Sequence, residues 1–370
     1  MKKISTITFH ASYNYGSCLQ AYALQEYVKH ICNYNCDYKI INLRTDIQKN
    51  KYKCIFEKTG IKNNIKKMIF WNKKKEILKK QENFEKFIGN YLQLTKEFNK
   101  FEELQKETWS SEYYIAGSDQ LWNLQAQDFD WANYLEFIDN GKKISYAASW
   151  GPKPQTWNEE EKERAKKDLE RFEYLSVREN GSFDNVVELL GKKPEINVDP
   201  TLLLDKSEWK KIINKERIIS FKYIFLYNLK GKEYIDLAKK ISNELKIPVV
   251  VSKFGNKYEL IYGFKKRYDV GPLEFLNLIE NAELVLSSSF HGTIFSILLN
   301  KPFFALKGMN DFRISTILEK MGLENRSIDF EDYKTKCKEA FNIDFTESEK
   351  LLEIERKKSE EYLKKALDIE

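Results

Sequence analysis

Residues 285–302 read VLSSSFHGTIFSILLNKP and contain the clearest structural signal in the chain. An apolar run that starts at Ala282 ends at three serines, and the apolar residues after His291-Gly292 have the spacing of a buried helix. The pattern predicts a strand, a tight turn and a helix N-terminus. In open α/β sheets, ligands bind at the carboxyl ends of strands, and the N–H groups of the following helix favour an anion there. His291, one of three histidines in 370 residues, lies at this junction; its alternative role is that of a packed or capping histidine.

Two more predicted strands end in polar residues. Residues 112–116 lead into a Gly-Ser-Asp turn, where Asp119 is suited either to bind a ligand hydroxyl or to cap the turn. Residues 174–177 form a short strand that brings Arg178 to the same edge of the sheet. A guanidinium there binds a carboxylate or phosphate through two hydrogen bonds, or it forms a structural pair with Glu179 or another acid.

The N-terminal part begins with a strand–loop–helix pattern. Residues 4–9 are predicted to form the first strand, and the HASYNYG loop at 10–16 leads into a helix with Ser17 as its N-cap. One glycine, Gly16, does not make a phosphate-binding fingerprint, so the loop by itself is an ordinary connection. Strands and helices alternate through both halves of the chain, which predicts an α/β fold.

The positive charge of the chain is concentrated in one stretch. The net charge is +6, but residues 49–80 hold 12 lysines against Glu57 and Glu76, so this stretch carries +10 and the remainder −4. This distribution argues against a wide nucleic-acid-binding face, and no DNA or RNA recognition motif is present. A hydrophobic fraction of 42% with 14% aromatic residues excludes a disordered chain.

The Lys-rich stretch lies in a predicted helical insertion at about 46–107. Ile61, Ile65, Met68 and Ile69 fall on one helical face, with lysines around them. Two interpretations stay open. The segment is either a solvated helical hairpin packed on the first domain, or a basic amphipathic helix that lies on an anionic membrane surface.

The cysteine content predicts neither disulfides nor a zinc site. The five cysteines are Cys18, Cys32, Cys36, Cys54 and Cys337. Their number is odd, their spacing is irregular, and no second pair or histidine cluster completes a metal site. No acidic pair has the spacing of a metal site either. Because no signal peptide and no run of about 18 apolar residues is present, the chain is expected to be cytoplasmic.

Four motifs follow one another along the chain. They are GSDQLWN at 117–123, SVRE at 176–179, VDPT at 198–201 and SSFHGTIFSILLNKPF at 288–303. In this combination and order they resemble the motifs of the polysaccharide pyruvyl transferases. The resemblance runs from about Ile4 to about Leu323 and is interrupted by the Lys-rich insertion.

The resemblance implies two Rossmann-like domains that face a cleft, an arrangement similar to the GT-B class of glycosyltransferases. The N-terminal domain, on the acceptor side, is expected at residues 1–205 and includes the basic insertion. The C-terminal domain, on the donor side, is expected at 206–345. Residues 346–370 are expected to form a helix that packs back onto the first domain.

The resemblance also implies an activity. The enolpyruvyl group of phosphoenolpyruvate would move onto a sugar of a cell-surface polysaccharide, or of its lipid-linked precursor, and form a pyruvate ketal. Phosphoenolpyruvate is then the donor substrate, a glycan is the acceptor, and no cofactor or metal is implied. His291 is expected to act as the general acid, and Arg178 to hold the donor. The other expected donor-binding residues are Ser288, Ser289, Phe290, Gly292 and Arg313. The expected acceptor-binding residues are Asn14, Gly16, Ser118 and Asp119.

One position departs from the family pattern. Many members carry an arginine two residues before the histidine, where this chain has Ser289. We treat Arg313 and Lys307, on the elements that follow, as hypothetical sources of the missing positive charge.

Two other functions fit the same architecture. A GT-B sugar-nucleotide glycosyltransferase would use acidic residues such as Glu274 and Glu280 to bind its nucleotide sugar. A non-catalytic glycan-binding subunit of capsule synthesis would use the same cleft, although the presence of both His291 and Arg178 argues against it. Peripheral membrane contact through residues 49–80, at the inner face of the membrane, would suit an enzyme whose acceptor is carried on a lipid.

Overall fold

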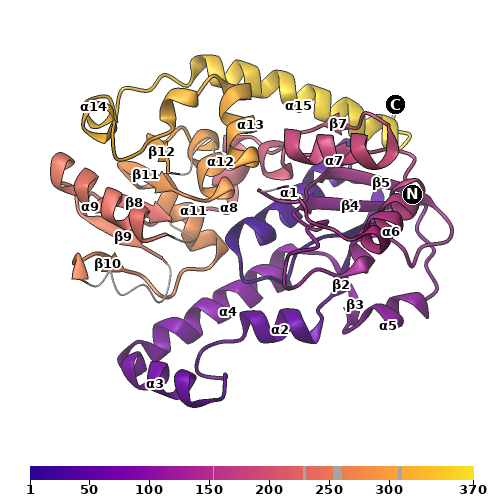
Figure 1. Ribbon diagram of the computed structural model, residues 1–370, viewed down its shortest axis with the longest axis horizontal. Helices are drawn as coiled ribbons and strands as arrows, with labels where there is room; N and C mark the ends of the chain where they lie inside the picture. The colour runs from indigo at the N-terminus through magenta and orange to yellow at the C-terminus, as the bar shows by residue number, and fades with distance from the viewer. Residues whose placement is uncertain (153, 228–230, 253–260, 307–310) are drawn as a thin grey trace. The chain divides into compact units, whose positions relative to one another are not determined.

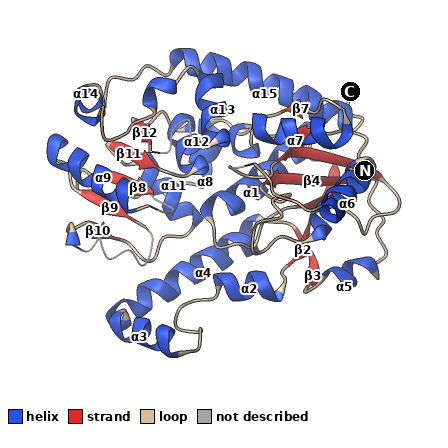
Figure 2. Ribbon diagram, in the orientation of Figure 1, coloured by secondary structure: helices blue, strands red, loops and turns tan. Residues whose placement is uncertain are grey.

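The structure, a computed structural model, describes residues 1–152, 154–227, 231–252, 261–306 and 311–370 (Figure 1). Its contacts divide the chain into two compact units. The first unit comprises Met1–Lys53, Ile88–Leu204 and Glu353–Glu370, and the second comprises Cys54–Phe87 and Asp205–Leu352. Each unit contains a parallel sheet with its strands between helices (Figure 2), which confirms the predicted α/β fold with two Rossmann-like parts.

The sheet of the first unit has seven strands in the order β3-β2-β1-β4-β5-β6-β7. The strands are β1 (Lys2–Ile7), β2 (Cys36–Leu43), β3 (Leu94–Phe98), β4 (Tyr113–Asp119), β5 (Lys142–Ala148), β6 (Ser176–Val177) and β7 (Glu195–Ile196). The helices are α1 (Tyr15–Ile31), α2 (Asp46–Tyr52), α5 (Phe101–Gln105), α6 (Glu159–Leu169) and α7 (Asn180–Leu190), with 3-10 turns η2 (Trp131–Tyr134) and η3 (Pro200–Leu202). The strand order reverses between β1 and β4, so the ligand position of this sheet lies beyond the carboxyl ends of these two strands.

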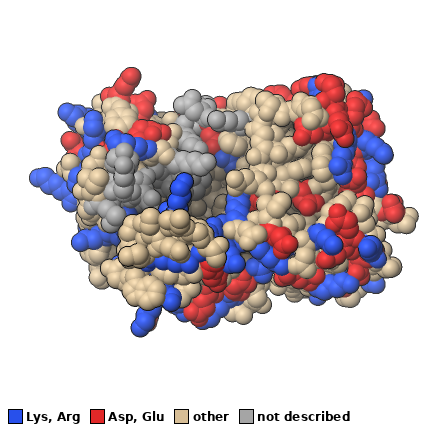
Figure 3. Space-filling view, turned by 60° about the horizontal axis from the view of Figure 1, so that its bottom comes forward, with Lys and Arg blue, Asp and Glu red and all other residues tan. Residues whose placement is uncertain are grey.

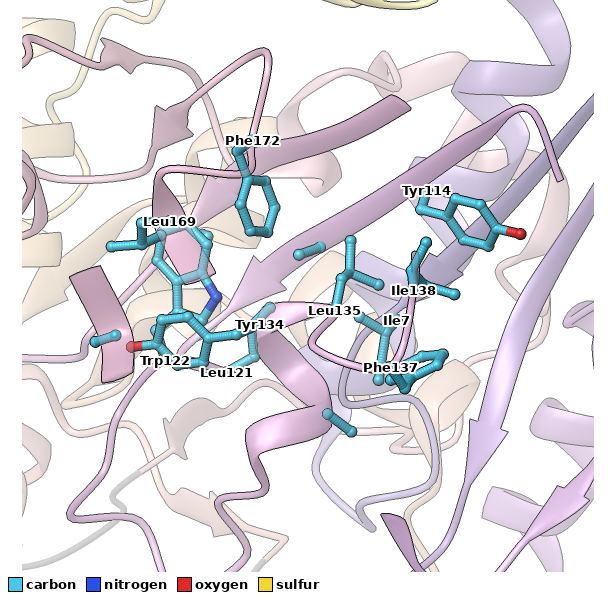
Figure 4. Close-up of a cluster of buried hydrophobic side chains, with 14 of the residues drawn as sticks. Ile7, Tyr114, Leu121, Trp122, Tyr134, Leu135, Phe137, Ile138, Leu169 and Phe172 are labelled. Atoms are coloured by element: carbon cyan, nitrogen blue, oxygen red, sulfur yellow. The ribbon is translucent and has the colours of Figure 1, made fainter. Parts of the chain in front are cut away.

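An aromatic core fixes the loops at that end of the sheet (Figure 4). The ring of Trp122 stacks on Tyr134 at 5.4 Å between centroids and meets Trp150 at 4.7 Å. The indole N–H of Trp122 donates to the carbonyl of Asn133, and its backbone N–H donates to the carbonyl of Ser149. The turn after β4 is therefore tied to the loop after β5 and to η2, so the polar residues at this edge stand on a packed support.

Among its described residues, the sheet of the second unit has five strands in the order β10-β9-β8-β11-β12. The strands are β8 (Ile224–Tyr227), β9 (Val249–Val251), β10 (Lys265–Lys266), β11 (Leu284–Ser287) and β12 (Phe303–Ala305). The helices are α8 (Lys206–Ile212), α9 (Lys232–Leu245), α11 (Pro272–Glu280), α12 (Phe290–Leu298), α13 (Phe312–Met321) and α14 (Tyr333–Lys338), with a 3-10 turn η5 (Glu324–Arg326). The order reverses between β8 and β11, and β11 leads directly into α12, as the sequence predicts.

The Lys-rich stretch folds into α2, α3 (Ile61–Ile69), a 3-10 turn η1 (Trp71–Lys73) and α4 (Lys74–Tyr91). By its contacts the segment Cys54–Phe87 belongs to the second unit, although the whole insertion is expected from the sequence in the first domain. The stretch after α4 also returns to regular structure, because Leu94–Phe98 pairs with β2 as the edge strand β3. Only part of the predicted insertion is thus an addition to the α/β pattern.

The last helix, α15 (Thr346–Ala366), ends on the first unit. The hydroxyl of Tyr362 donates to the carbonyl of Ser145 on β5 at 2.7 Å. The hydroxyl of Ser359 accepts the backbone N–H of Val198 at 3.1 Å. Both bonds are buried, so the end of the chain is an integral part of the first unit.

Candidate functional site

The turn between β11 and α12 holds the histidine that the sequence singles out. Ser289 is the N-cap of α12 and has an extended backbone, but its side chain makes no capping hydrogen bond. His291 lies in the first turn of the helix and is only 7% exposed. The N–H groups of a first helical turn have no acceptor within the helix, so this turn presents donors and an imidazole together.

Close packing sets the shape of this turn. The hydroxyl of Ser287 accepts the N–H of Ser289 and donates to its carbonyl, both at 3.0 Å. The N–H of Ser288 donates to the carbonyl of Tyr227 on β8 at 3.1 Å. A side chain at Gly292 would place its Cβ 2.2 Å from the Ser287 hydroxyl, so only glycine lets α12 approach the strand this closely. Of the predicted donor-binding residues, Ser288, Ser289, Phe290 and Gly292 all belong to this one turn.

Arg313 lies beside the same turn, but its charge is already paired. Its guanidinium carbon is 5.7 Å from the ring centroid of Phe290. Two of its nitrogens donate to the carboxylate of Asp311, at 3.0 and 2.8 Å, and both side chains are largely buried. Arg313 is therefore near enough to contribute positive charge at the turn, although Asp311 offsets that charge. Lys307, the other residue considered for this role, lies outside the described residues.

In the first unit, the end of β4 adopts a backbone that its sequence permits. Gly117 has φ +142°, and a Cβ there would lie 2.0 Å from the carbonyl oxygen of Tyr146. Asp119 has φ +72°, the left-handed region that Asp tolerates better than most residues. Between them, the hydroxyl of Ser118 donates to the carbonyl of Ala147 and is fully buried. These contacts give Ser118 a structural role, and they do not favour its predicted contact with an acceptor.

The carboxylate of Asp119 is held at both oxygens. Ser17, on α1, donates its hydroxyl to Oδ2 at 2.6 Å, and the backbone N–H of Gln120 donates to Oδ1 at 2.8 Å. Ser17 was expected to be the N-cap of α1, but that role belongs to Asn14, whose side chain accepts the N–H of Gly16 at 3.0 Å. The predicted acceptor residues Asn14 and Gly16 thus begin α1, and Ser17 one residue later links that helix to Asp119.

Arg178 lies among carboxylates. Its guanidinium contacts Asp199 at 2.7 Å and Glu179 at 3.3 Å, and one nitrogen is 3.8 Å from Asp119. Burial opposes the charged guanidinium, but the three carboxylates outweigh this effect, so the pKa of Arg178 lies above its ordinary value. One positive charge faces three negative ones, so the group is formally −2. This geometry favours the structural ion pair over direct binding of a donor anion.

Sequence reasoning missed two residues of this cluster. Asp199 belongs to the VDPT motif, yet the motif suggested no role for its side chain. Ser17 was considered only as a helix cap. The signal for Asp199 was the Asp-Pro pair at 199–200, because an aspartate before a proline is typical of a turn that presents its carboxylate.

A model of the polysaccharide pyruvyl transferase family matches residues 14–308, about four fifths of the chain. The chain belongs to this family. The match covers both strand ends described above, with Asp119, Arg178 and His291, and it ends before Arg313. No match is found among curated proteins.

Solved structures of the GT-B fold are similar to the chain. A Staphylococcus aureus MnaA structure with UDP has 10% identical residues and a TM-score of 0.54, with 95% of this chain and 90% of that chain covered. A Listeria monocytogenes structure named as a UDP-N-acetylglucosamine 2-epimerase has 10% identity, a TM-score of 0.50 and the same coverage, 95% and 90%. At such low identity the likeness shows the fold alone, and it confirms the predicted GT-B-like class.

Neither a metal cluster nor a membrane-spanning helix is found in the described part of this transferase family member. No group of three or more His, Cys, Asp or Glu residues there is arranged to hold a metal ion. No helix among the same residues combines the length and hydropathy needed to cross a bilayer.

Proposed function

We propose that this chain transfers the enolpyruvyl group of phosphoenolpyruvate to a sugar of a cell-surface polysaccharide, or of its lipid-linked precursor, and forms a cyclic pyruvate ketal. The observation that carries the proposal is the position of His291. In a member of the pyruvyl transferase family, it stands in the first turn of α12, where the N-cap side chain leaves the helix N–H groups to other acceptors. An acid and a set of anion-binding donors therefore share one turn.

The proposed reaction requires both a proton donor and anion-binding N–H groups. His291 gives a proton to the methylene carbon of phosphoenolpyruvate, which leaves an oxocarbenium-like centre at the neighbouring carbon. A sugar hydroxyl bonds to that carbon and loses its proton. The bond between that carbon and the phosphate oxygen breaks and releases inorganic phosphate. A second hydroxyl of the sugar then bonds to the same carbon, loses its proton and closes the ketal.

The donor in this proposal is held at α12. The first-turn N–H groups and the hydroxyls of Ser288 and Ser289 face its anionic groups. The arginine that many family members carry at position 289 is missing here. Arg313 is the nearest replacement we propose, because its guanidinium lies over Phe290. Its ion pair with Asp311 makes it a weaker anion ligand than an unpaired arginine.

The acceptor in this proposal is held at the end of β4. A sugar is neutral and rich in hydroxyls, and the formally negative cluster around Asp119 suits hydroxyl donors better than a phosphate. Ser17 and the Gln120 N–H fix the carboxylate orientation. We assign Arg178 a positioning role, because it holds three carboxylates in place.

Calorimetry with phosphoenolpyruvate and with UDP tests the donor assignment. We expect phosphoenolpyruvate to bind the wild type and, within a few-fold, the His291→Asn variant. The same variant should lose phosphate release from phosphoenolpyruvate when a panel of glycan acceptors is supplied, because the asparagine side chain cannot give up a proton. Binding of UDP with none of phosphoenolpyruvate would instead identify a sugar-nucleotide glycosyltransferase. Donor binding with unchanged turnover in His291→Asn would remove His291 from the mechanism.

Arg178→Ala separates the two roles considered for that residue. A positioning role predicts a loss of about 3 to 5 kcal/mol in the free energy of unfolding, because three buried carboxylates lose their cation. Donor affinity of the folded fraction should change little. Lys162→Ala is the control, since that lysine pairs with Glu188 at the surface and should leave the unfolding midpoint unchanged. A stable Arg178→Ala variant that no longer binds phosphoenolpyruvate would restore the donor-binding role.

A further inference from the structure

Helix α3 presents an apolar stripe to solvent. The stripe consists of Ile61, Ile65, Met68 and Ile69, which are 81%, 53%, 79% and 62% exposed. None of the nine residues of α3 is buried. At about 100° per residue the four side chains span an arc of about 100°, the width of a face that a surface helix normally packs against a core. Among the described residues of the second unit, no core covers this α3 stripe.

Lysines border the α3 stripe. Lys62 and Lys66 continue the helical wheel on one side of it, and Lys67 lies on the far face. Within the described residues, these three lysines have no carboxylate at ion-pair distance, in contrast to Lys73, which pairs with Glu76. Figure 3 shows, at lower left, an uncharged surface over the part of the molecule that carries α3, with Lys and Arg side chains at its edge.

The exposed tryptophan next to α3 extends the stripe. All seven tryptophans lie in the described ranges, and Trp71 on η1 is the one among them that is exposed, at 64%. Its ring stands at 6.3 Å from that of Phe56, and the ammonium of Lys74 lies 4.8 Å from its centroid. An indole beside an ammonium at the end of an apolar face is the composition of a membrane–water interface.

Other residues attach the helical hairpin to the second unit, so the stripe is not needed for that contact. The ring of Phe70 meets that of Tyr268 edge-on at 6.2 Å. On α4, Asn83 donates to the carbonyl of Asp269 at 2.8 Å, and Gly271 leaves room for Asn83 because a Cβ would lie 2.5 Å from it. The hairpin is thus held through its inner residues while the α3 stripe faces outward.

We propose that α3 and η1 form a docking surface for an anionic lipid membrane, with the α3 stripe and Trp71 among the lipid headgroups and the lysines on the lipid phosphates. The lysines around the α3 stripe distinguish between three possible partners of this face, namely a second copy of the chain, a nucleic acid and an anionic membrane. A second copy of the chain, joined through the same face, would bring the lysines of residues 49–80 together, and like charges oppose that contact. A nucleic acid matches the lysines but not four apolar side chains, whereas an anionic bilayer matches both. This inference does not rest on the proposed reaction.

Co-sedimentation with vesicles tests the proposal. We expect binding to phosphatidylcholine vesicles that contain about 30 mol% phosphatidylglycerol, and little binding to pure phosphatidylcholine, since each lysine near an anionic surface is worth about fivefold in affinity. Ile65→Glu/Met68→Glu should lower the partition coefficient at least tenfold. Ile354→Glu, on α15, is the matched control, because Ile354 is also 61% exposed and far from the lysine cluster in sequence. Equal binding of both variants would overturn the proposal.

A second pair of variants tests whether the lysines of α3 contribute to membrane binding. Lys62→Gln/Lys66→Gln/Lys67→Gln should weaken binding at least tenfold, and raised salt should have the same effect on the wild type, because it screens exposed charges. Lys192→Gln/Lys193→Gln/Lys358→Gln removes the same charge at exposed positions elsewhere and should bind as the wild type does. If both triple variants weaken binding equally, net charge alone is responsible and α3 is not the docking surface.

The fluorescence of Trp71 reports whether this residue inserts into the membrane. Brominated phosphatidylcholine in the anionic vesicles should quench part of the protein fluorescence, and Trp71→Phe should abolish that quenching without abolishing sedimentation. Quenching that survives in Trp71→Phe, or none in the wild type, contradicts insertion at η1. A dimer in analytical ultracentrifugation that Ile65→Glu/Met68→Glu abolishes would identify a second copy as the occupant and would also overturn the proposal.

Discussion

Gly292, in the first turn of α12, has only a hydrogen atom where any other residue has a side chain. The space beside Gly292 is filled by the hydroxyl and Cβ of Ser287 and by the ring of Tyr227. These atoms belong to two neighbouring strands, so they cannot move apart without disturbing the sheet. The position of His291 relative to β11 therefore depends on the residue that follows it.

Gly292→Ala should destabilise the protein by about 1 to 3 kcal/mol, the usual cost of overpacking a filled interior. Donor binding should weaken as well, because the first turn of α12 must shift. Chemical denaturation and calorimetry measure the two effects. Gly89→Ala is the control: Gly89 lies in α4 with no atom within 4 Å of an added Cβ, so alanine there should stabilise the helix by about 0.5 to 1 kcal/mol. Equal effects at both positions would contradict the packing argument.

Arg178 marks a limit of local sequence patterns. Its place at the end of a short strand was predictable, and both of its roles were considered. Its partners come from the end of β4, from the residue before α7 and from the residue before η3, so the carboxylates meet only after the sheet has formed. A sequence pattern identifies a strand end, but it does not show how many carboxylates from other segments lie next to that end in the folded chain.

At the scale of elements, α12 was predictable from local sequence signals, whereas the surroundings of α3 were not. The β11–turn–α12 unit was predicted correctly because its apolar run, its turn and its buried helix are all local signals. The apolar spacing of α3 was read correctly too, but spacing does not reveal the partner of an apolar face. The edge strand β3 was missed, since LTKEF has little alternation, and its edge position requires none.

The C-terminal helix depends on buried hydrogen bonds that sequence does not reveal. Tyr362 is almost fully buried, and its hydroxyl donates to the carbonyl of Ser145. Tyr362→Phe should lower the free energy of unfolding by about 1 to 3 kcal/mol, because the carbonyl is left without this donor. Tyr34→Phe is the control, since Tyr34 is 66% exposed and the change should be within about 0.5 kcal/mol. Urea denaturation of both variants measures the difference.

At the scale of the whole molecule, two sheets repeat one strand order. In the first sheet β1 lies between β2 and β4, and in the second sheet β8 lies between β9 and β11. The repetition puts Asp119 at one reversal point and His291 at the other, each at a carboxyl end. This much follows from alternating elements in the sequence. The division of the chain between the units follows only in part: the return of the C-terminal residues to the first unit was expected from the family resemblance, but the assignment of Cys54–Phe87 to the second unit was not.

Removal of residues 353–370 should therefore act on one unit. Hydrogen exchange of the shortened chain should speed up in β5 and around Val198, which lose their contacts with Tyr362 and Ser359. Amides of β8 and β11 should keep their protection, because the second unit loses none of its own residues. Uniformly faster exchange in both sheets would show that the two units unfold together.

The return of α15 to the first unit also orders events during synthesis. Leu352, the last residue of the second unit, is synthesised before Glu353–Glu370, which belong to the first unit. The part of the molecule that is translated first is thus the last to be completed. The seven-stranded sheet of the first unit therefore reaches its final packing only after residues 353–370 have been synthesised.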